Sequence, residues 1–258
     1  MSTGDAVRCE DVSVVYRTDQ GGDVLALDHI DFSVGRREFV CVVGPSGCGK
    51  STLLNLIGGF EAPTSGKITM AGQEILAPGA DRAMVFQRPA LYPWLTIADN
   101  IAFGLRFRRC SRADIRNKVD YFLDRMGLER FRHLRPYEVS GGMQQRVAMA
   151  RALIVEPSVL LMDEPFGALD AQTRSAMQEF LLELWQDLDV AVVFVTHDVA
   201  EAILLGDRVV VMTAHPGRIL CQEEIALQRP RNTAIELSQE FVAVRKHLAA
   251  EQSHVPIN

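Results

Sequence analysis

The stretch Cys41–Phe60, "CVVGPSGCGKSTLLNLIGGF", is the most informative part of this sequence about the fold. It opens with a short apolar run, which predicts a buried strand. A loop with three glycines, a proline and two serines follows. After Gly49, apolar residues recur at helical spacing and predict the buried face of a helix; they are Leu53, Leu54, Leu56 and Ile57. The stretch therefore predicts a strand and a helix joined by a flexible, glycine-rich loop.

The loop follows the pattern G-x-x-x-x-G-K-[ST], in the strand–loop–helix context that this pattern requires. Glycines let successive backbone N–H groups converge on one anion, and the N-terminus of the following helix adds positive partial charge. A plain glycine-rich turn that caps a helix is the alternative, and the four fixed positions favour a phosphate-binding loop. Its predicted residues are Gly44, Pro45, Ser46, Gly47, Cys48, Gly49, Lys50, Ser51 and Thr52.

Individual side chains of this loop have distinct expected roles. Lys50 is expected to reach the β- and γ-phosphates of a nucleotide, and the Ser51 hydroxyl is expected to ligate Mg²⁺. Thr52 is expected to contact the α-phosphate. Cys48 occupies a variable position of the pattern, so its backbone belongs to the loop while its side chain is expected to be a bystander.

Composition limits the classes of function. The chain has 258 residues, of which 48% are hydrophobic and 23% charged, so it has a globular composition. It carries 27 basic and 33 acidic residues, a formal net charge of −6. Without an overall basic field, nucleic acid is not an expected partner. The basic run Arg106–Arg112 is interpreted as a solvated helix face, with a local contact site as the alternative.

Cysteine content and hydropathy indicate the cellular compartment in which the chain is expected to function. The five cysteines show no paired spacing for zinc or redox chemistry, which is typical of a reducing compartment. The N-terminal "MSTGDAVRCED" contains acids and no apolar segment, so we do not expect a signal peptide. The longest apolar runs are too short to cross a bilayer. Any association with a membrane is expected to depend on a partner.

Strands alternate with helices over much of the chain, which predicts an α/β fold with a largely parallel sheet covered on both faces. Between about Arg88 and Ile154 the pattern is helical, and we interpret this part as a subdomain inserted into the core. The predicted division is an α/β nucleotide-binding core formed by residues 1–87 and 155–225, an inserted helical subdomain at 88–154, and a polar C-terminal tail at 226–258 with one short helix.

A second part of a nucleotide site follows the helical segment. In "SVLLMDEP", four apolar residues predict a buried strand that ends at Asp163. The carboxyl ends of such strands form the ligand-binding edge of an α/β sheet. Asp163 is therefore expected to hold Mg²⁺, mostly through water, and Glu164 to orient and polarise an attacking water. The alternative, a helix N-terminus, is disfavoured by the following Pro165.

A second anion site is predicted in "YEVSGGMQQRVAMARAL". Ser140 is suited to cap a helix, and Gly141 and Gly142 leave backbone amides bare. Capping alone is the simpler interpretation. The same geometry also opens a helix N-terminus to a phosphate, so the chain has two phosphate-directed helix ends that lie far apart in the sequence.

The phosphate loop and the motifs "VFQ", "VSGGMQQR", "LLMDEP", "GALD" and "VTHD" occur in the order and spacing of an ABC transporter ATPase subunit. The resemblance covers about residues 6–225. It implies a P-loop NTPase core, with a RecA-like mixed sheet, an N-terminal antiparallel β subdomain and an inserted α-helical subdomain, in a single ABC ATPase domain. It also implies ATP and Mg²⁺ as cofactors. The usual signature L-S-G-G-Q is here Val139–Met143, with the serine and glycines kept.

The resemblance implies roles for four further residues. Tyr16 falls where an aromatic ring stacks on adenine. Gln87 resembles the residue that senses Mg²⁺ and the attacking water at the joint between the core and the helical lobe. His197 resembles the switch histidine that contacts the γ-phosphate. Asp170 resembles an aspartate at the seam between two cassettes, although it is also placed to cap the helix that begins at Ala171.

The resemblance also implies partners. In this family, the signature helix of one cassette reaches the ATP held by the other, so a second copy, or a paralogous cassette, is expected in a head-to-tail dimer. The segment after Gln87 is the zone that receives a membrane permease, and its apolar residues either dock there or pack in the core; they are Leu91, Tyr92, Trp94 and Leu95.

The amino-acid sequences of several segments resemble those of ATPases from the nitrate, sulfonate and taurine branch of bacterial importers. That branch implies a permease, a periplasmic or extracellular substrate-binding protein, and a peripheral location on the cytoplasmic face of the inner membrane. Sulfonate or taurine is the first choice of solute, nitrate the second and a thiamine-precursor-like heterocycle the third. A soluble, non-transport ABC ATPase is the alternative of a different class.

Overall fold

The computed structural model describes residues 4–18 and 21–253. Within them, the largest sheet has six strands in the order β10-β9-β3-β8-β7-β6. Its strands from β9 to β6 run parallel, and β10 pairs antiparallel with β9 at one edge. The strands are β3 (Phe39–Val43), β6 (Arg82–Val85), β7 (Val159–Asp163), β8 (Ala191–Thr196), β9 (Arg208–Met212) and β10 (Ile219–Glu224).

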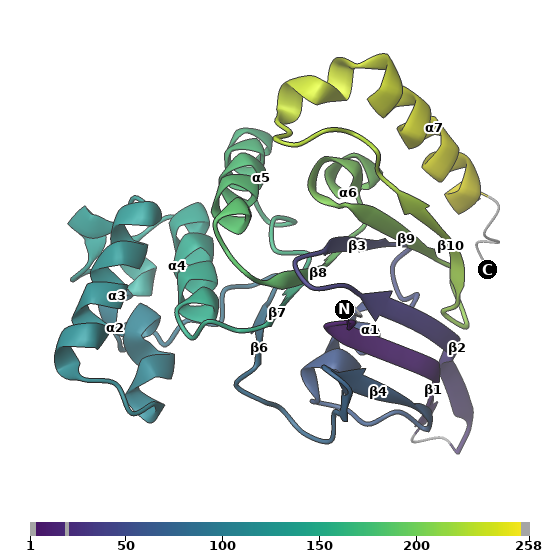
Figure 1. Cartoon of the computed structure of the whole chain (residues 1–258), viewed down its shortest axis with the longest axis horizontal. Helices are drawn as coiled ribbons and strands as arrows, with labels where there is room; N and C mark the ends of the chain where they lie inside the picture. Colours follow the sequence, from purple (N-terminus) through teal and green to yellow (C-terminus); the bar gives the residue numbers. More distant parts are fainter. Residues whose placement is uncertain (1–3, 19–20, 254–258) are drawn as a thin grey trace.

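A smaller antiparallel sheet has the order β2-β1-β4-β5 and lies beside the first helix, α1 (Lys50–Gly58) (Figure 1). This is the N-terminal antiparallel part that the family resemblance implies. Its strands are β1 (Val7–Arg17), β2 (Asp23–Val34), β4 (Ser65–Met70) and β5 (Gln73–Glu74).

Helices occupy the chain between β6 and β7 and project away from the sheets (Figure 1). They are α2 (Ile97–Ala102), η1 (Phe103–Phe107), α3 (Arg112–Arg125), η2 (Glu129–Phe131), η3 (Pro136–Glu138) and α4 (Gly141–Leu153). The helical pattern was expected from about Arg88, but the first helix begins at Ile97. Pro89 and Pro93 explain the difference, because proline cannot donate a helical hydrogen bond. The exact division into core and inserted subdomain stays a prediction.

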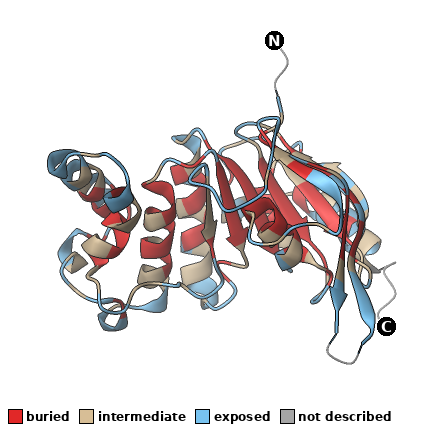
Figure 2. Ribbon diagram, turned by 90° about the horizontal axis from the view of Figure 1, so that it is seen from below, coloured by how far each residue is buried: buried red, intermediate tan, exposed pale blue. Residues whose placement is uncertain are grey.

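The central sheet is buried on both faces, which explains its nearly continuous apolar strands. In β3, Phe39 and Cys41 belong to the core cluster on the side of α4, α5 (Ala171–Gln186) and α6 (Val199–Leu205). Val40 and Val42 belong to the cluster on the side of α1 and the small sheet. Figure 2 shows the buried strands between these layers.

The C-terminal part, predicted to be a polar tail, is instead integrated into the core. It forms η4 (Thr233–Leu237) and α7 (Gln239–Ser253), which crosses the outer side of α6 (Figure 1). Phe241 and Leu248 of α7 are fully buried. The prediction of a short helix is confirmed, but a sparse apolar pattern concealed its packing. Residues 254–258 of the predicted tail lie outside the described residues.

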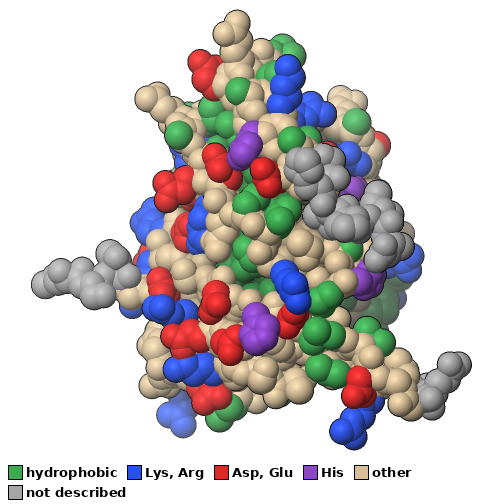
Figure 3. Space-filling model, turned by 90° about the vertical axis from the view of Figure 1, so that its right-hand side faces the viewer, with side chains coloured by type: hydrophobic (Ala, Val, Ile, Leu, Met, Phe, Trp, Pro, Cys, Tyr) green, Lys and Arg blue, Asp and Glu red, His purple; other side chains and the backbone are tan. Residues whose placement is uncertain are grey.

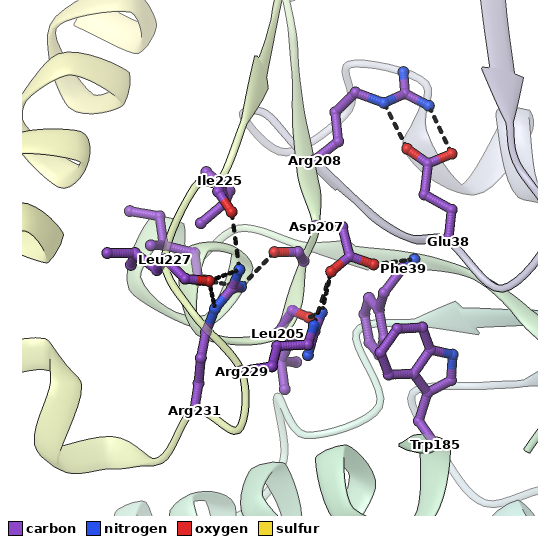
Figure 4. A network of polar contacts seen from close by, with 12 residues as sticks. Glu38, Phe39, Trp185, Leu205, Asp207, Arg208, Ile225, Leu227, Arg229 and Arg231 are labelled. Carbon is purple, nitrogen blue, oxygen red and sulfur yellow. Dashed lines mark hydrogen bonds and ion pairs between the residues drawn. The ribbon is translucent and has the colours of Figure 1, made fainter. Parts of the chain in front are cut away.

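Two arginines attach this C-terminal part to α6 and to the sheet (Figure 4). The buried Arg231 guanidinium donates to the carbonyls of Ile203, Gly206, Ile225 and Leu227. Arg229 donates to Asp207, which also accepts from the backbone N–H at the start of β3. Burial lowers the pKa of Arg231 to about 10, so it remains charged at neutral pH.

The surface carries both charge signs. Figure 3 shows acidic and basic side chains intermixed across the face at the right of Figure 1. For residues 4–18 and 21–253, no helix combines the length and the apolar content that a membrane span requires.

Candidate nucleotide site

The glycine-rich loop connects β3 to α1 at the carboxyl edge of the central sheet, as the sequence predicts. Gly49 caps α1 with φ of 91°, a left-handed conformation that favours glycine. A Cβ at Gly49 would lie 2.5 Å from a methyl carbon of Leu27, and one at Gly44 would lie 2.9 Å from the Met212 carbonyl oxygen. Glycine is therefore required at both ends of the loop, where β2 and β9 pack behind it.

The Lys50 side chain lies along this loop and is buried. Its ammonium donates to the carbonyl oxygens of Gly44 and Pro45 at 2.8 and 3.0 Å. These contacts hold the Lys50 ammonium group against the phosphate loop. The Cys48 thiol is buried beneath the loop, and burial raises its pKa. Only the backbone of Cys48 is thus placed to contribute to anion binding.

The magnesium-binding residues proposed from the sequence come together. Ser51, in the first turn of α1, donates a hydrogen bond to Asp163 at the end of β7. Burial, and to a lesser degree the nearby Glu164 carboxylate, raise the pKa of Asp163. A half-buried carboxylate paired with a hydroxyl is a donor set that suits Mg²⁺, a hard cation that prefers oxygen ligands.

Tyr16, the residue expected to stack on adenine, stands beside the same helix. Its hydroxyl lies 3.4 Å from the Thr52 hydroxyl and donates to the Glu61 carboxylate. The side chain is 40% exposed, so its ring remains accessible next to the phosphate loop. Its stacking on adenine stays a prediction.

Glu164 and His197 meet at the carboxyl ends of β7 and β8. The imidazole Nδ1 lies 3.3 Å from a Glu164 carboxylate oxygen. Glu164 has φ of 41°, an unfavourable left-handed conformation for a residue with a side chain. Its N–H donates to the Val195 carbonyl at 2.9 Å, which holds it against the end of β8. Strain of this kind is typical of functional sites.

Gln87 reaches the same place from the end of β6. A Cβ built on Gly167 would lie 3.3 Å from the Gln87 amide nitrogen and 3.7 Å from a Glu164 carboxylate oxygen. Both side chains therefore border Gly167. The structure thus brings Gln87, Glu164 and His197 together, although they are widely separated in the sequence.

A cavity of about 40 Å³ lies beside Glu164 and His197, large enough for a water molecule. It is lined partly by residues that the sequence analysis missed. Arg174 of α5 donates to the Leu169 carbonyl, and among the described residues its buried Nε has no hydrogen-bond partner. The buried Glu201 of α6 accepts from Gln178. Neither belongs to a short motif, so only the packing of α5 against α6 reveals them.

The predicted second anion site is the start of α4, in the helical part of the molecule (Figure 1). Ser140 caps this helix by accepting from the Met143 N–H at 3.4 Å. Gly141 has open space where a Cβ would lie, and a Cβ on Gly142 would meet Thr173 of α5 at 2.8 Å. Asp170 caps α5 by accepting from the Thr173 N–H at 3.0 Å. The starts of α4 and α5 are therefore neighbours.

Comparison with known proteins agrees with this arrangement. The family model described as ABC transporter matches residues 27–167. The nitrate import ATP-binding protein NrtD of Synechocystis sp. is 50% identical over 209 residues, covering 81% of this chain and 78% of that protein. The chain belongs to the ABC transporter family. The taurine import ATP-binding protein TauB of Pelagibacter ubique, another member of this family, is 47% identical over 81% of this chain and 79% of its own length.

Solved ABC cassettes share the fold. The dimeric structure of MJ0796, a bacterial ABC transporter cassette, is 32% identical with a TM-score of 0.76, covering 86% of this chain and all of that one. A dimeric post-hydrolysis state of MJ0796 bound to ADP and phosphate has a TM-score of 0.75 at the same identity and covers 86% of this chain and all of that one. The chain is accordingly an ATPase of the P-loop fold, which confirms the predicted fold and reaction.

Proposed function

We propose that this chain is the ATP-hydrolysing subunit of a bacterial importer of a small anionic solute, a sulfonate such as taurine or else nitrate. The observation that carries the proposal is the convergence of Lys50, Asp163, Glu164 and His197 at one edge of the sheet. The import functions named for NrtD and TauB support the class of transporter and solute.

Each side chain then has a task in hydrolysis. Lys50 and the loop amides bind the β- and γ-phosphates. Glu164 accepts a hydrogen bond from the attacking water and polarises it as a general base. His197, which lies next to Glu164, contacts the γ-phosphate. Gln87 borders the same water position. Because Glu164 is anchored by its backbone to β8, its carboxylate is oriented before the substrate arrives.

Magnesium belongs to this proposal because the oxygen donors fit it. Ser51 would ligate the ion directly, Asp163 would hold it mostly through water, and Gln87 would approach it from the core–helix joint. Mg²⁺ bound there would supply positive charge that stabilises the phosphate groups. The ion also offsets the charge of Asp163, whose burial otherwise disfavours ionisation.

A second copy completes the site. Ser140, Gly141 and Gly142 form an exposed helix start that belongs to the helical part of the chain, so we propose that it binds the nucleotide held by a partner cassette. Asp170 would lie at the seam between the two cassettes. The dimeric state named for MJ0796 supports this head-to-tail arrangement.

The permease would dock on the segment after Gln87. Trp94 is 69% exposed there, while Leu91 packs against the core. Tyr92 lies between the two, with its ring 4.3 Å from that of Phe103 and 5.6 Å from that of Trp94. An exposed tryptophan on a packed aromatic base is suited to a protein interface. The chain would thus be held peripherally at the cytoplasmic face of the inner membrane, with a separate binding protein delivering the solute.

Substitution of the proposed water-orienting residue tests the mechanism. In Glu164→Gln we expect ATP hydrolysis to fall by at least about 100-fold, because the amide cannot accept a proton. Nucleotide binding should persist, and the nucleotide-loaded dimer should accumulate in size-exclusion chromatography. The matched control is Glu183→Gln on the exposed side of α5, which should hydrolyse ATP at the normal rate.

Uptake of labelled taurine and of labelled nitrate, in cells that contain the chain and its permease, tests the transport class. Uptake of either solute that is lost in Glu164→Gln supports the proposal. Normal hydrolysis by Glu164→Gln would remove this residue from its role. An ATP-loaded Glu164→Gln protein that stays monomeric beside its permease would contradict the head-to-tail dimer.

A further inference from the structure

Helix α4 carries the signature residues at its start, and its buried side contacts the chain around Gln87. Gln145, which is 1% exposed, lies on this side. Its amide nitrogen donates to the carbonyl oxygen of Phe86 at 3.3 Å. Phe86 directly precedes Gln87 on the β6 side of the joint. One side chain of the signature helix therefore holds the backbone next to the residue that borders the attacking water.

The same helix holds the chain on the other side of Gln87. Arg151 donates to the Ala90 carbonyl at 2.7 Å, and its guanidinium lies 5.5 Å from the centre of the Tyr92 ring. Burial lowers the pKa of Arg151, a sign that its charge is held away from water. The fully buried Asn100 fixes Tyr92 further, because its side-chain oxygen accepts from the Tyr92 N–H and its amide donates to the Tyr92 carbonyl.

These two attachments differ in what they connect. Arg151 joins α4 to a segment that packs with the helices, so its contact lies within one body. Gln145 joins α4 to the end of β6, which is part of the central sheet. A rotation of the helices relative to the sheet leaves the Arg151 contact intact and alters the Gln145 contact, because only the latter crosses the joint at Gln87.

We propose that Gln145 is a positioning residue that couples the two nucleotide sites of the dimer. Through the Phe86 carbonyl it sets the position of Gln87 and the orientation of α4 together. Gln87 borders the nucleotide of its own chain, and the start of α4 faces the nucleotide of the partner. Occupation of one site is thereby transmitted to the other. This inference rests on the head-to-tail dimer and on the roles of Gln87 and Ser140 proposed above.

The test replaces the amide and keeps the size of the side chain. Gln145→Met and Gln145→Leu remove the donor while filling the same buried space. The wild-type chain with its permease is expected to hydrolyse ATP with a Hill coefficient well above 1, and both variants with a Hill coefficient near about 1. Binding of ATP to the isolated chain should change by less than about twofold, since Gln145 does not contact the phosphate loop.

The neighbouring glutamine provides a matched control. The Gln144 amide donates to the Pro136 and Val139 carbonyls, both on the helical side of the joint. Gln144→Met loses hydrogen bonds of the same kind without affecting the bridge to β6, and it should therefore retain cooperativity. Equal loss of cooperativity in Gln144→Met would overturn the inference, because it would indicate general damage to the signature helix.

Two outcomes separate this inference from the proposed function. In the first outcome, wild type, Gln145→Met and Gln145→Leu hydrolyse ATP with equal cooperativity and unfold at the same temperature. This outcome overturns the role of Gln145 and leaves the proposed function intact. A wild-type chain that hydrolyses ATP without cooperativity and stays monomeric with its permease overturns the dimer on which the role depends.

Discussion

At the scale of single residues, the site consists of groups held in unfavourable states by their surroundings. Glu164 has a left-handed backbone, and Asp163 is a carboxylate whose ionisation is opposed by burial. These features cost stability in the nucleotide-free chain and become favourable when a charged ligand is bound.

The state of Asp163 leads to a prediction about stability. Since its pKa is raised in the folded chain, the folded state retains the proton to a higher pH than the unfolded state. The free energy of unfolding therefore falls as the pH rises from the pKa of Asp163 in the unfolded chain to its raised pKa in the folded chain. At pH 7 the ionised carboxylate opposes folding.

We accordingly expect Asp163→Asn to stabilise the nucleotide-free chain. The gain should be about 0.5 kcal/mol at pH 7, a low value because solvent screens this half-buried group. Magnesium-dependent ATP hydrolysis should be lost in the same variant. Thermal unfolding with and without Mg²⁺ and ATP measures both effects. A variant that is less stable than wild type at pH 7 without ligand would contradict the assignment of Asp163 as a strained carboxylate.

At the scale of elements, the motif residues also begin helices. Ser140 caps α4, Asp170 caps α5 and Asp198 caps α6. The start of α6 directly follows His197 at the end of β8, and the starts of α4 and α5 lie next to each other. The capping interpretation of Asp170 is therefore confirmed, and its role at the seam between two cassettes stays a prediction.

Substitution at Asp170 separates these two roles. Asn caps helices about as well as Asp, whereas Ala does not. We expect Asp170→Ala to lower the unfolding temperature by about 2–4 °C and Asp170→Asn to lower it by less than half of that. If Asp170 also acts at the dimer seam, both variants should show weaker ATP-dependent dimerisation. Equal unfolding temperatures for Asp170→Ala and wild type would contradict the capping role.

At the scale of the whole molecule, the C-terminal part closes the core. Helix α7 covers α6, and Arg229 and Arg231 connect it to the sheet through Asp207 and the carbonyls around Gly206 (Figure 4). Since α6 begins directly after His197 and Asp198, this packing also fixes the element that follows the proposed switch histidine.

Removing the anchor of α7 should therefore destabilise the entire chain. We expect Phe241→Ala to lower the free energy of unfolding by about 3–5 kcal/mol, as for other fully buried aromatic residues. Val242→Ala is the matched control. Val242 is 37% exposed, so its truncation should lower the free energy of unfolding by less than about 1 kcal/mol. Chemical denaturation measures both. A loss below about 1 kcal/mol in Phe241→Ala would show that α7 is a dispensable attachment.

Local sequence patterns predicted the phosphate loop, the strand that ends at Asp163, the caps at Ser140 and Asp170, and the α/β class. These features depend on residues within a few positions of one another, so local patterns are sufficient to predict them. The contacts of Glu164 with His197, of Gln145 with Phe86, and of α7 with α6 become visible only in the folded structure. Those contacts join segments far apart in the chain, and the packing of the helices on the sheet, which no local pattern encodes, brings them together.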